Sequence, residues 1–158
     1  MQRKFDFIDI AGFTAFGLVI ILAVGIFELS TVPARPSTLN LGTGWLLVGG
    51  LATLWILPLF AQKVPLSQRT IYKNLHRIFG IGFLIVMVLH ARSVGYMMLL
   101  WLFGAILVLS LVALLHSKIQ AINNPLFLKV WWCSHVGMAT LITTMSLIHV
   151  YAQYAYDN

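Results

Sequence analysis

Four of the five histidines form two pairs with the same spacing. His76 and His90 lie in one long apolar stretch, His135 and His149 lie in another, and fourteen positions separate the members of each pair. In a helix of about 3.6 residues per turn and about 1.5 Å rise, fourteen steps come within roughly 40° of four whole turns and climb about 21 Å. Each pair therefore shares one helix face, with one histidine near each edge of an apolar span.

Two such helices side by side would bring four imidazoles to two levels, two at each level. A six-coordinate haem takes one axial nitrogen from either side of its iron, so the pattern predicts two stacked bis-histidine haems. A zinc ion would need its ligands clustered in a tetrahedron rather than separated by four turns. Proton relays usually combine histidine with Asp or Glu, and the apolar spans carry acidic residues only at their mouths.

A simpler alternative is that the histidines only pack. A single histidine within a membrane helix is as often a helix–helix hydrogen-bonding residue as a metal ligand. That alternative has to explain both the repeated spacing and the matched depth of the two pairs. The repetition therefore favours haem ligation, with His76, His90, His135 and His149 as the iron ligands.

The composition is that of a membrane protein. The 158 residues are 60% hydrophobic and only 9% charged, with a mean hydropathy of +0.93, whereas ordinary globular chains carry about 25% charged residues. The formal charge of +6 comes from scattered basic residues, so no nucleic-acid partner is expected. With Cys133 as its one cysteine and no C-x-x-C-H motif, the chain can form neither an internal disulfide nor a standard c-type haem attachment.

The apolar runs predict a single all-α domain over residues 1–158, a polytopic bundle of five membrane helices with a four-helix-type di-haem core. The first helix is interpreted as an uncleaved anchor, and Pro58 is expected to bend or end the second. The predicted helices span about 7–29, 45–62, 75–92, 96–116 and 130–152.

The basic residues predict the orientation of these helices. With the N-terminus inside, eight basic residues fall on the inner side and two on the outer side, which the positive-inside rule favours. The inner residues are Arg3, Lys4, Lys63, Arg69, Lys73, Arg77, Lys118 and Lys129, and the outer ones are Arg35 and Arg92. Both histidine helices then run from inside to outside. His76 is therefore expected to pair with His135 near the inner face, and His90 with His149 near the outer face.

Residues near the histidines fit a planar macrocycle, although each has a simpler interpretation. Gly80 and Gly82 lie between the first two histidines, where glycine would let a flat ring approach the backbone; packing of helices on small residues is equally common. Phe83 and Ile142 fall midway between the ligands of their helices and are expected to fill the space between two haems.

Haem propionates need cationic or hydrogen-bonding partners. Lys73, Arg77 and Lys129 are placed for the inner haem, and Arg92 or Arg35 for the outer one. Taken singly, each of these residues could also be an ordinary anchor at the membrane interface.

Three further residues are interpreted without a ligand role. Trp131 and Trp132 stand where an aromatic belt is expected. His116 ends the fourth predicted helix at the inner surface with no partner in phase, so it is treated as interfacial, with a quinone or proton-transfer role left open.

The two histidine helices resemble the haem-binding helices of the ferric reductase-like transmembrane domains. This family includes NADPH oxidases, ferric reductases and the haem subunit of the bacterial periplasmic methionine sulfoxide reductase system. The residues that carry the resemblance are His76, Arg77, Gly80 and His90 in the first helix and Trp131, Trp132, His135 and His149 in the second.

The resemblance implies two non-covalent b haems and electron transfer from an inner donor to an outer acceptor. We expect a bacterial inner-membrane protein, with the cytoplasmic N-terminus and the periplasmic or external C-terminus that the basic residues predict. The family typically has a sixth span, and many members continue into a flavin and nicotinamide domain. Neither is evident here, so we expect a subunit that receives electrons from a separate flavoprotein reductase or a membrane quinol, with any flavin or quinone supplied by that partner.

Two other functions remain open at this point. The chain could be a quinol-oxidising or quinone-reducing cytochrome b subunit that anchors a dehydrogenase or reductase, with the same haems. It could also be a scaffold or transporter without redox activity, whose histidines only pack. Purified protein would be coloured in the first case and colourless in the second.

Overall fold

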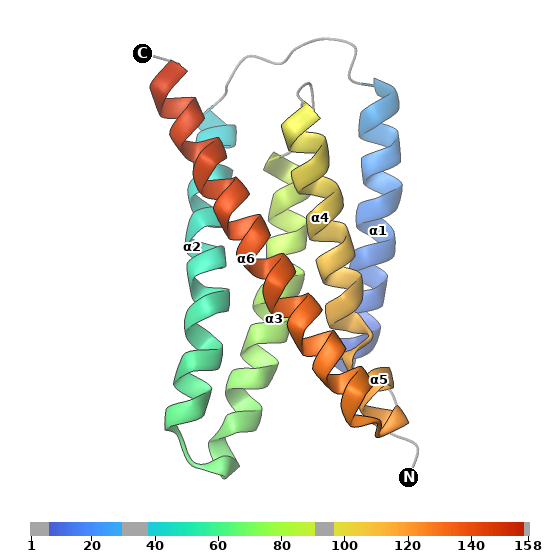
Figure 1. Ribbon diagram of the computed structural model, residues 1–158. Helices are drawn as coiled ribbons and strands as arrows, with labels where there is room; N and C mark the ends of the chain where they lie inside the picture. The colour runs from blue at the N-terminus through green and yellow to red at the C-terminus, as the bar shows by residue number, and fades with distance from the viewer. Residues whose placement is uncertain (1–6, 30–37, 91–96, 157–158) are drawn as a thin grey trace. The chain divides into compact units, whose positions relative to one another are not determined.

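The computed structural model describes residues 7–29, 38–90 and 97–156, and these residues form helices joined by short connections (Figure 1). No strand occurs within the described ranges, which confirms the predicted all-α class. The helices are α1 (Phe7–Leu29), α2 (Thr38–Lys63), α3 (Leu66–His90), α4 (Met97–Leu114), α5 (His116–Ile122) and α6 (Pro125–Tyr156).

Three of the helices are long and apolar enough to cross a membrane, which supports the predicted membrane protein. These spans are Leu41–Lys63, Leu66–His90 and Pro125–Ala155. Shorter apolar stretches lie in α1, at Phe7–Leu22, and in α4, at Trp101–Leu114. A membrane-spanning helix needs about 20 residues, so five spans stay a prediction while three are supported by length and composition.

Helix α3 begins well before its predicted start. The polar stretch that was expected to be a connector is helical from Leu66, and the chain turns between α2 and α3 at Val64 and Pro65. The amide of Gln68 donates to the carbonyl of Pro65 at 2.9 Å, which closes the first turn. A polar sequence such as this one, with Arg69, is stable as helix where it continues an apolar one, because each added residue gains a backbone hydrogen bond.

Helix α2 also extends beyond its predicted limits. It begins at Thr38 and continues through Pro58 to Lys63, so the proline does not end the helix. Proline is tolerated inside membrane helices because neighbouring groups satisfy the carbonyl that it leaves without its usual donor.

A short helix, α5, occupies part of the predicted connector between the fourth and fifth spans. It ends at Ile122 and is capped by Asn123, whose φ of 51° lies in the left-handed region that asparagine tolerates. The side chain of Asn124 then accepts a hydrogen bond from the amide of Leu126 at 2.9 Å, and Pro125 is the first residue of α6. The predicted start of this helix, at about residue 130, is therefore too late, although an asparagine cap followed by proline is a favoured helix start.

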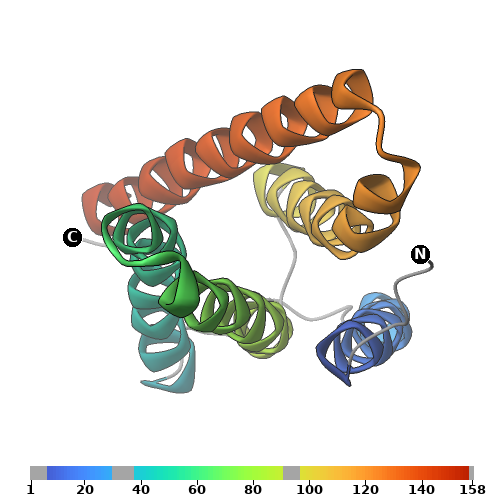
Figure 2. The ribbon, with the colours of Figure 1, turned by 90° about the horizontal axis from the view of Figure 1, so that it is seen from below.

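The helices group into two compact units, α1–α3 and α4–α6, and each is described by itself. In the first, α2 and α3 form an antiparallel hairpin and α1 packs along α3 (Figure 2). A Cβ atom built on Gly50 of α2 would lie 3.3 Å from the ring of Phe83 on α3, so the glycine permits the close approach of the two helices. Leu84, Met87 and Val88 are the buried residues of α3.

An ion pair joins α1 to α3. Asp9, whose whole residue is only 7% exposed, accepts a hydrogen bond from the guanidinium of Arg77. A carboxylate that is removed from water is costly unless a cation and hydrogen bonds compensate it. The pair therefore fixes the N-terminal end of α1 beside the first half of α3.

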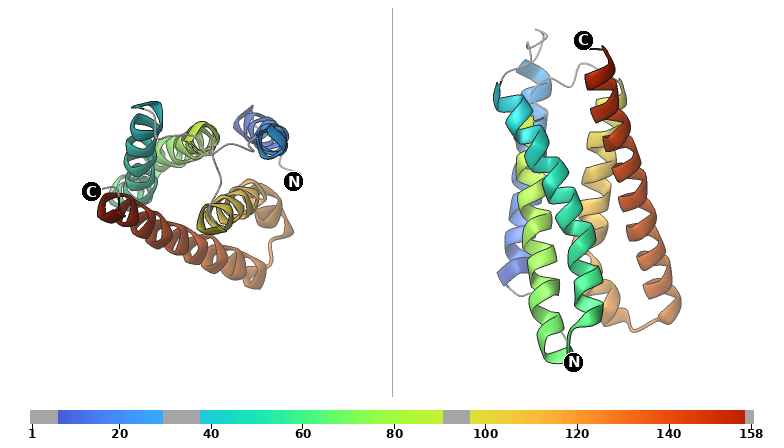
Figure 3. Two further views of the ribbon diagram at one scale, coloured as in Figure 1. Left: turned by 90° about the horizontal axis from the view of Figure 1, so that it is seen from above. Right: turned by 90° about the vertical axis from the view of Figure 1, so that its left-hand side faces the viewer.

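In the second unit, α4 packs on α6, and α5 turns the chain between them (Figure 3). Phe103 and Ile106 of α4 are buried. The indole Nε1 of Trp131 on α6 donates to the carbonyl of Val112 on α4 at 2.7 Å. This bond ties α6 to the last turn of α4, just before α5 begins.

We expect Asp9→Asn to lower the free energy of unfolding by about 1–3 kcal/mol, less than for a fully buried pair because the Arg77 side chain is 25% exposed. Arg77→Gln should have a similar effect, and the double variant should lose less than the sum of the two. Unfolding by SDS titration in bicelles, followed by far-UV circular dichroism, measures all three. Strictly additive losses would show that the pair contributes nothing.

Candidate functional site

The four predicted ligand histidines lie on two uninterrupted helices. His76 and His90 belong to α3, and His135 and His149 belong to α6. Since both helices are continuous between their histidines, each pair shares one helix face as the spacing predicts. The two helices belong to different units, so the pairing of His76 with His135 and of His90 with His149 stays a prediction.

His90 rests against two consecutive residues of α2. The hydroxyl oxygen of Thr43 lies 3.2 Å from Nδ1 of the imidazole, and Thr43 is only 6% exposed. A Cβ atom built on Gly44 would lie 3.2 Å from Cε1 of the same ring. A metal-binding histidine usually gives one ring nitrogen to an outer hydrogen bond and the other to the metal. With Nδ1 engaged by Thr43, coordination would use Nε2.

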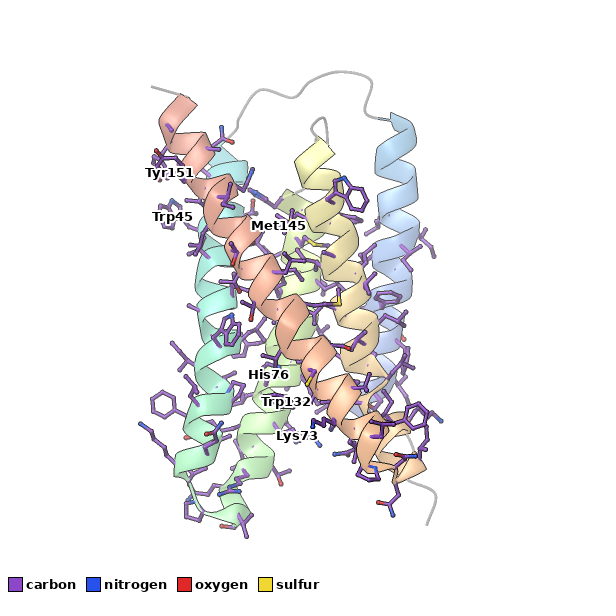
Figure 4. All side chains as sticks on the ribbon, viewed as in Figure 1. Trp45, Lys73, His76, Trp132, Met145 and Tyr151 are labelled. Atoms are coloured by element: carbon purple, nitrogen blue, oxygen red, sulfur yellow. The ribbon has the colours of Figure 1, made fainter. Side chains whose placement is uncertain are left out.

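His76 also lies against α2. Its Nδ1 atom is shielded from solvent, and the main chain of Leu54 is a hydrogen-bond neighbour of its ring. Lys73 lies three residues before it on α3, and Figure 4 shows both side chains on this helix. A Cβ atom built on Gly80, one turn after His76, would meet no atom within 4 Å, so the backbone there is open to approach.

The cations predicted to bind propionates have different surroundings. Arg77 is engaged by Asp9 of α1, an interaction that the sequence did not predict. Its guanidinium carries five N–H donors, so binding one carboxylate does not exhaust it. Lys73 is exposed on α3, and Lys129 is exposed near the start of α6. Arg92 lies outside the described residues, as does Arg35.

Three aromatic rings of the second unit form a row that ends at a predicted ligand. The rings of His116 and Trp131 have centroids 4.2 Å apart and are tilted by 38°. Those of Trp131 and His135 are 5.3 Å apart and stacked, at 14° to each other. The Nδ1 atoms of both histidines are shielded from solvent. The row, together with the bond from Trp131 to Val112, restrains the plane of the His135 imidazole.

This row changes the interpretation of two residues. His116 was expected to have no partner in phase, but it packs on Trp131. Trp131 faces these rings and α4, whereas its neighbour Trp132 is 59% exposed, as a residue of an aromatic belt would be. The i, i+4 spacing of Trp131 and His135 could have revealed their contact, since such residues are neighbours on a helix surface. The contact with His116 depends on α5, which no sequence signal predicted.

The residues midway between the ligands lie in packed positions. Ile142 is 1% exposed, and the ring of Phe83 lies against Gly50 of α2. Whether they also separate two haems stays a prediction. His149 is half-buried on α6, and Cys133 is exposed with no role evident from its surroundings.

Within the described ranges, no three His, Cys, Asp or Glu side chains gather where they could hold a metal ion. A haem with two axial histidines needs a pair of imidazoles rather than such a cluster. Three of the predicted ligands thus have a neighbour that orients the imidazole. These neighbours are the Thr43 hydroxyl for His90, the Leu54 main chain for His76 and the Trp131 ring for His135.

Comparison of the chain with protein-family models, with characterised proteins and with solved structures finds no match. The resemblance to the ferric reductase-like domains therefore depends on the histidine motifs alone.

We expect Trp131→Phe to lower the free energy of unfolding by about 0.6–1.5 kcal/mol, because it keeps a ring between the two histidines but loses the hydrogen bond to Val112. The matched control is Trp132→Phe on the same helix, whose exposed side chain should change stability by less than about 0.5 kcal/mol. SDS titration of both variants gives the comparison, and equal losses would show that the hydrogen bond does not stabilise the unit.

Proposed function

We propose that the chain is a membrane electron-transfer protein with two b-type haems. Each haem would be held by one histidine of α3 and one of α6: His76 with His135 towards the inner side, and His90 with His149 towards the outer side. The observation that carries this proposal is the fourteen-residue spacing, which recurs on two continuous apolar helices. Histidines that only pack between helices would not be expected to repeat this spacing on two helices.

The surroundings of the histidines fit haem ligation. Imidazole is a usual axial ligand of haem iron, and an outer hydrogen bond at one ring nitrogen commonly fixes the other towards the metal. Thr43 makes such a contact with His90, and stacking on Trp131 orients His135. The backbone at Gly80 is open enough for a flat ring to approach α3.

A bound haem supplies one-electron chemistry, and the protein would control access to it. With a histidine on each side of the iron, no coordination position stays open for oxygen or a substrate, so electrons would leave by transfer from the haem edge. In this arrangement, the apolar residues of α3 and α6 would keep water from the histidine face. Lys73, Arg77 and Arg92 would compensate the charge of propionates.

In this proposal the chain spans a bacterial inner membrane five times, with a cytoplasmic N-terminus. The excess of basic residues on the inner side supports this orientation. Electrons would enter on the cytoplasmic side from a flavoprotein reductase or a membrane quinol and leave to an outer acceptor. The chain is then an oxidoreductase subunit in the ferric reductase-like class rather than a self-sufficient enzyme.

The test is to count haem in the purified protein by pyridine haemochromogen and reduced-minus-oxidised spectra. We expect two low-spin b haems per chain, and loss of one haem in His76→Ala and in His90→Ala. His116→Ala is the matched control and should retain both haems, because His116 contacts Trp131 and is not an expected ligand. A colourless protein, or a haem content unchanged in both ligand variants, would overturn the proposal.

One observation favours the second candidate, a quinone-linked cytochrome b subunit. The row from His116 through Trp131 reaches the predicted inner ligand His135, and an imidazole beside an aromatic ring suits a quinone head group. In that case a quinone-site inhibitor should abolish haem reduction by quinol, and His116→Ala should slow the same reduction. Unchanged rates in both experiments would favour a flavoprotein donor.

A further inference from the structure

The hydroxyl of Thr43 makes a contact between two helices. Five Ser and Thr side chains hydrogen-bond the carbonyl four positions earlier on their own helix, which is the usual arrangement in apolar helices. They are Thr53, Ser110, Thr140, Thr143 and Thr144. The hydroxyl of Thr43 also lies 3.2 Å from the imidazole Nδ1 of His90 on α3, and this contact joins two helices.

Burial adds weight to this contact. Thr43 is 6% exposed in a part of α2 whose other side chains are largely apolar. A hydroxyl removed from water costs free energy unless it is hydrogen-bonded, so the contact with His90 offsets a real penalty. An alanine or valine at this position would avoid that penalty altogether, which makes packing alone a poor account of the threonine.

Gly44 supplies the second half of the arrangement. A Cβ atom at this position would lie 3.2 Å from Cε1 and 3.7 Å from Nδ1 of the His90 ring. The glycine therefore lets the imidazole lie directly on the α2 backbone, where a larger residue would displace it. One polar contact and one steric contact on consecutive residues together define both the position and the plane of the ring.

The α2–α3 packing keeps these contacts in register. Between the levels of His90 and His76, the ring of Phe83 lies against Gly50 of α2. A Cβ atom built on that glycine would be 3.3 Å from the ring. Nearer the other end, the main chain of Leu54 neighbours His76. Helix α2 thus contacts both histidines of α3, through the Thr43 hydroxyl at His90 and through the main chain of Leu54 at His76.

We propose that Thr43 is a positioning residue that orients His90 as a haem ligand and lowers the reduction potential of the haem that His90 binds. This inference rests on the proposed function. With iron on Nε2, Nδ1 carries the proton and donates it in a hydrogen bond to the Thr43 hydroxyl oxygen. A hydrogen-bonded Nδ1–H makes the imidazole a stronger electron donor, which favours the ferric state.

The test is a potentiometric titration of the full-length protein with both haems bound. Thr43→Val has nearly the same shape but no hydroxyl, and it should raise the midpoint potential of one of the two haems. Thr43→Ser restores the hydroxyl and should return that midpoint towards the wild-type value. Thr53→Val is the matched control on the same helix, because its hydroxyl bonds to Gly49 at 2.8 Å, and it should change neither midpoint.

A second variant examines the steric contact. Gly44→Ala should push the His90 ring from its position and change the electron paramagnetic resonance g values of the same haem, while the other haem keeps its signal. Haem content and far-UV circular dichroism of every variant confirm that the fold and both cofactors are retained.

The outcomes separate this inference from the function on which it rests. If the wild type holds two haems and Thr43→Val leaves both midpoints unchanged, the role of Thr43 is overturned and the proposed function stands. The role of Thr43 is likewise overturned if both midpoints shift together and Thr43→Ser does not reverse the change, since that would indicate a loosened structure. If the wild type binds no haem, the proposed function falls and the role of Thr43 falls with it.

Discussion

An imidazole on an apolar helix needs a polar neighbour or a metal, because the hydrocarbon core of a membrane offers no hydrogen bonds. Three of the described histidines lie against a neighbouring helix or ring. On α3, both histidines lie against α2, one at the Thr43 hydroxyl and one at the main chain of Leu54. On α6, His135 stacks on Trp131, whose indole is itself bonded to α4. In these three cases a neighbouring side chain or helix orients the ring.

The same constraint applies to the ion pair near the middle of α3. Arg77 directly follows His76, and its guanidinium reaches the buried carboxylate of Asp9 on α1. A charge of either sign left alone there would be costly, whereas the pair joins two helices. The first unit is therefore held by an ion pair near the middle of α3 and by the Thr43–His90 contact at the C-terminal end of that helix, with apolar packing around Leu84, Met87 and Val88.

The sequence was sufficient to predict the class of the fold and the phase of the histidines. Long apolar runs indicate membrane helices, and fourteen residues bring two side chains to one helix face whatever surrounds them. The predicted helix that contains His76 lies entirely within the described chain apart from its last two residues, 91 and 92. Its polar beginning was missed because charged residues between apolar runs usually indicate a loop.

Contacts between helices could not be predicted in the same way. The residues around Thr43 do not distinguish it from Thr53 on the same helix. The described hydrogen bond of Thr53 goes to the carbonyl of Gly49 in its own helix, whereas that of Thr43 reaches His90 on α3. The stacking of His116 depends on the turn that α5 makes, and the ion pair of Asp9 depends on how α1 packs along α3. Such contacts depend on which residues of neighbouring helices lie side by side, and a single sequence does not give that information.

The central claim is that one haem joins α3 to α6 at each level, and the haem content of two double variants tests it most directly. His76→Ala/His135→Ala removes both ligands of one predicted haem, so it should lose one haem and keep the other. His76→Ala/His90→Ala removes one ligand from each predicted haem, so it should lose both. Loss of both haems in the first variant and only one in the second would contradict the pairing by depth.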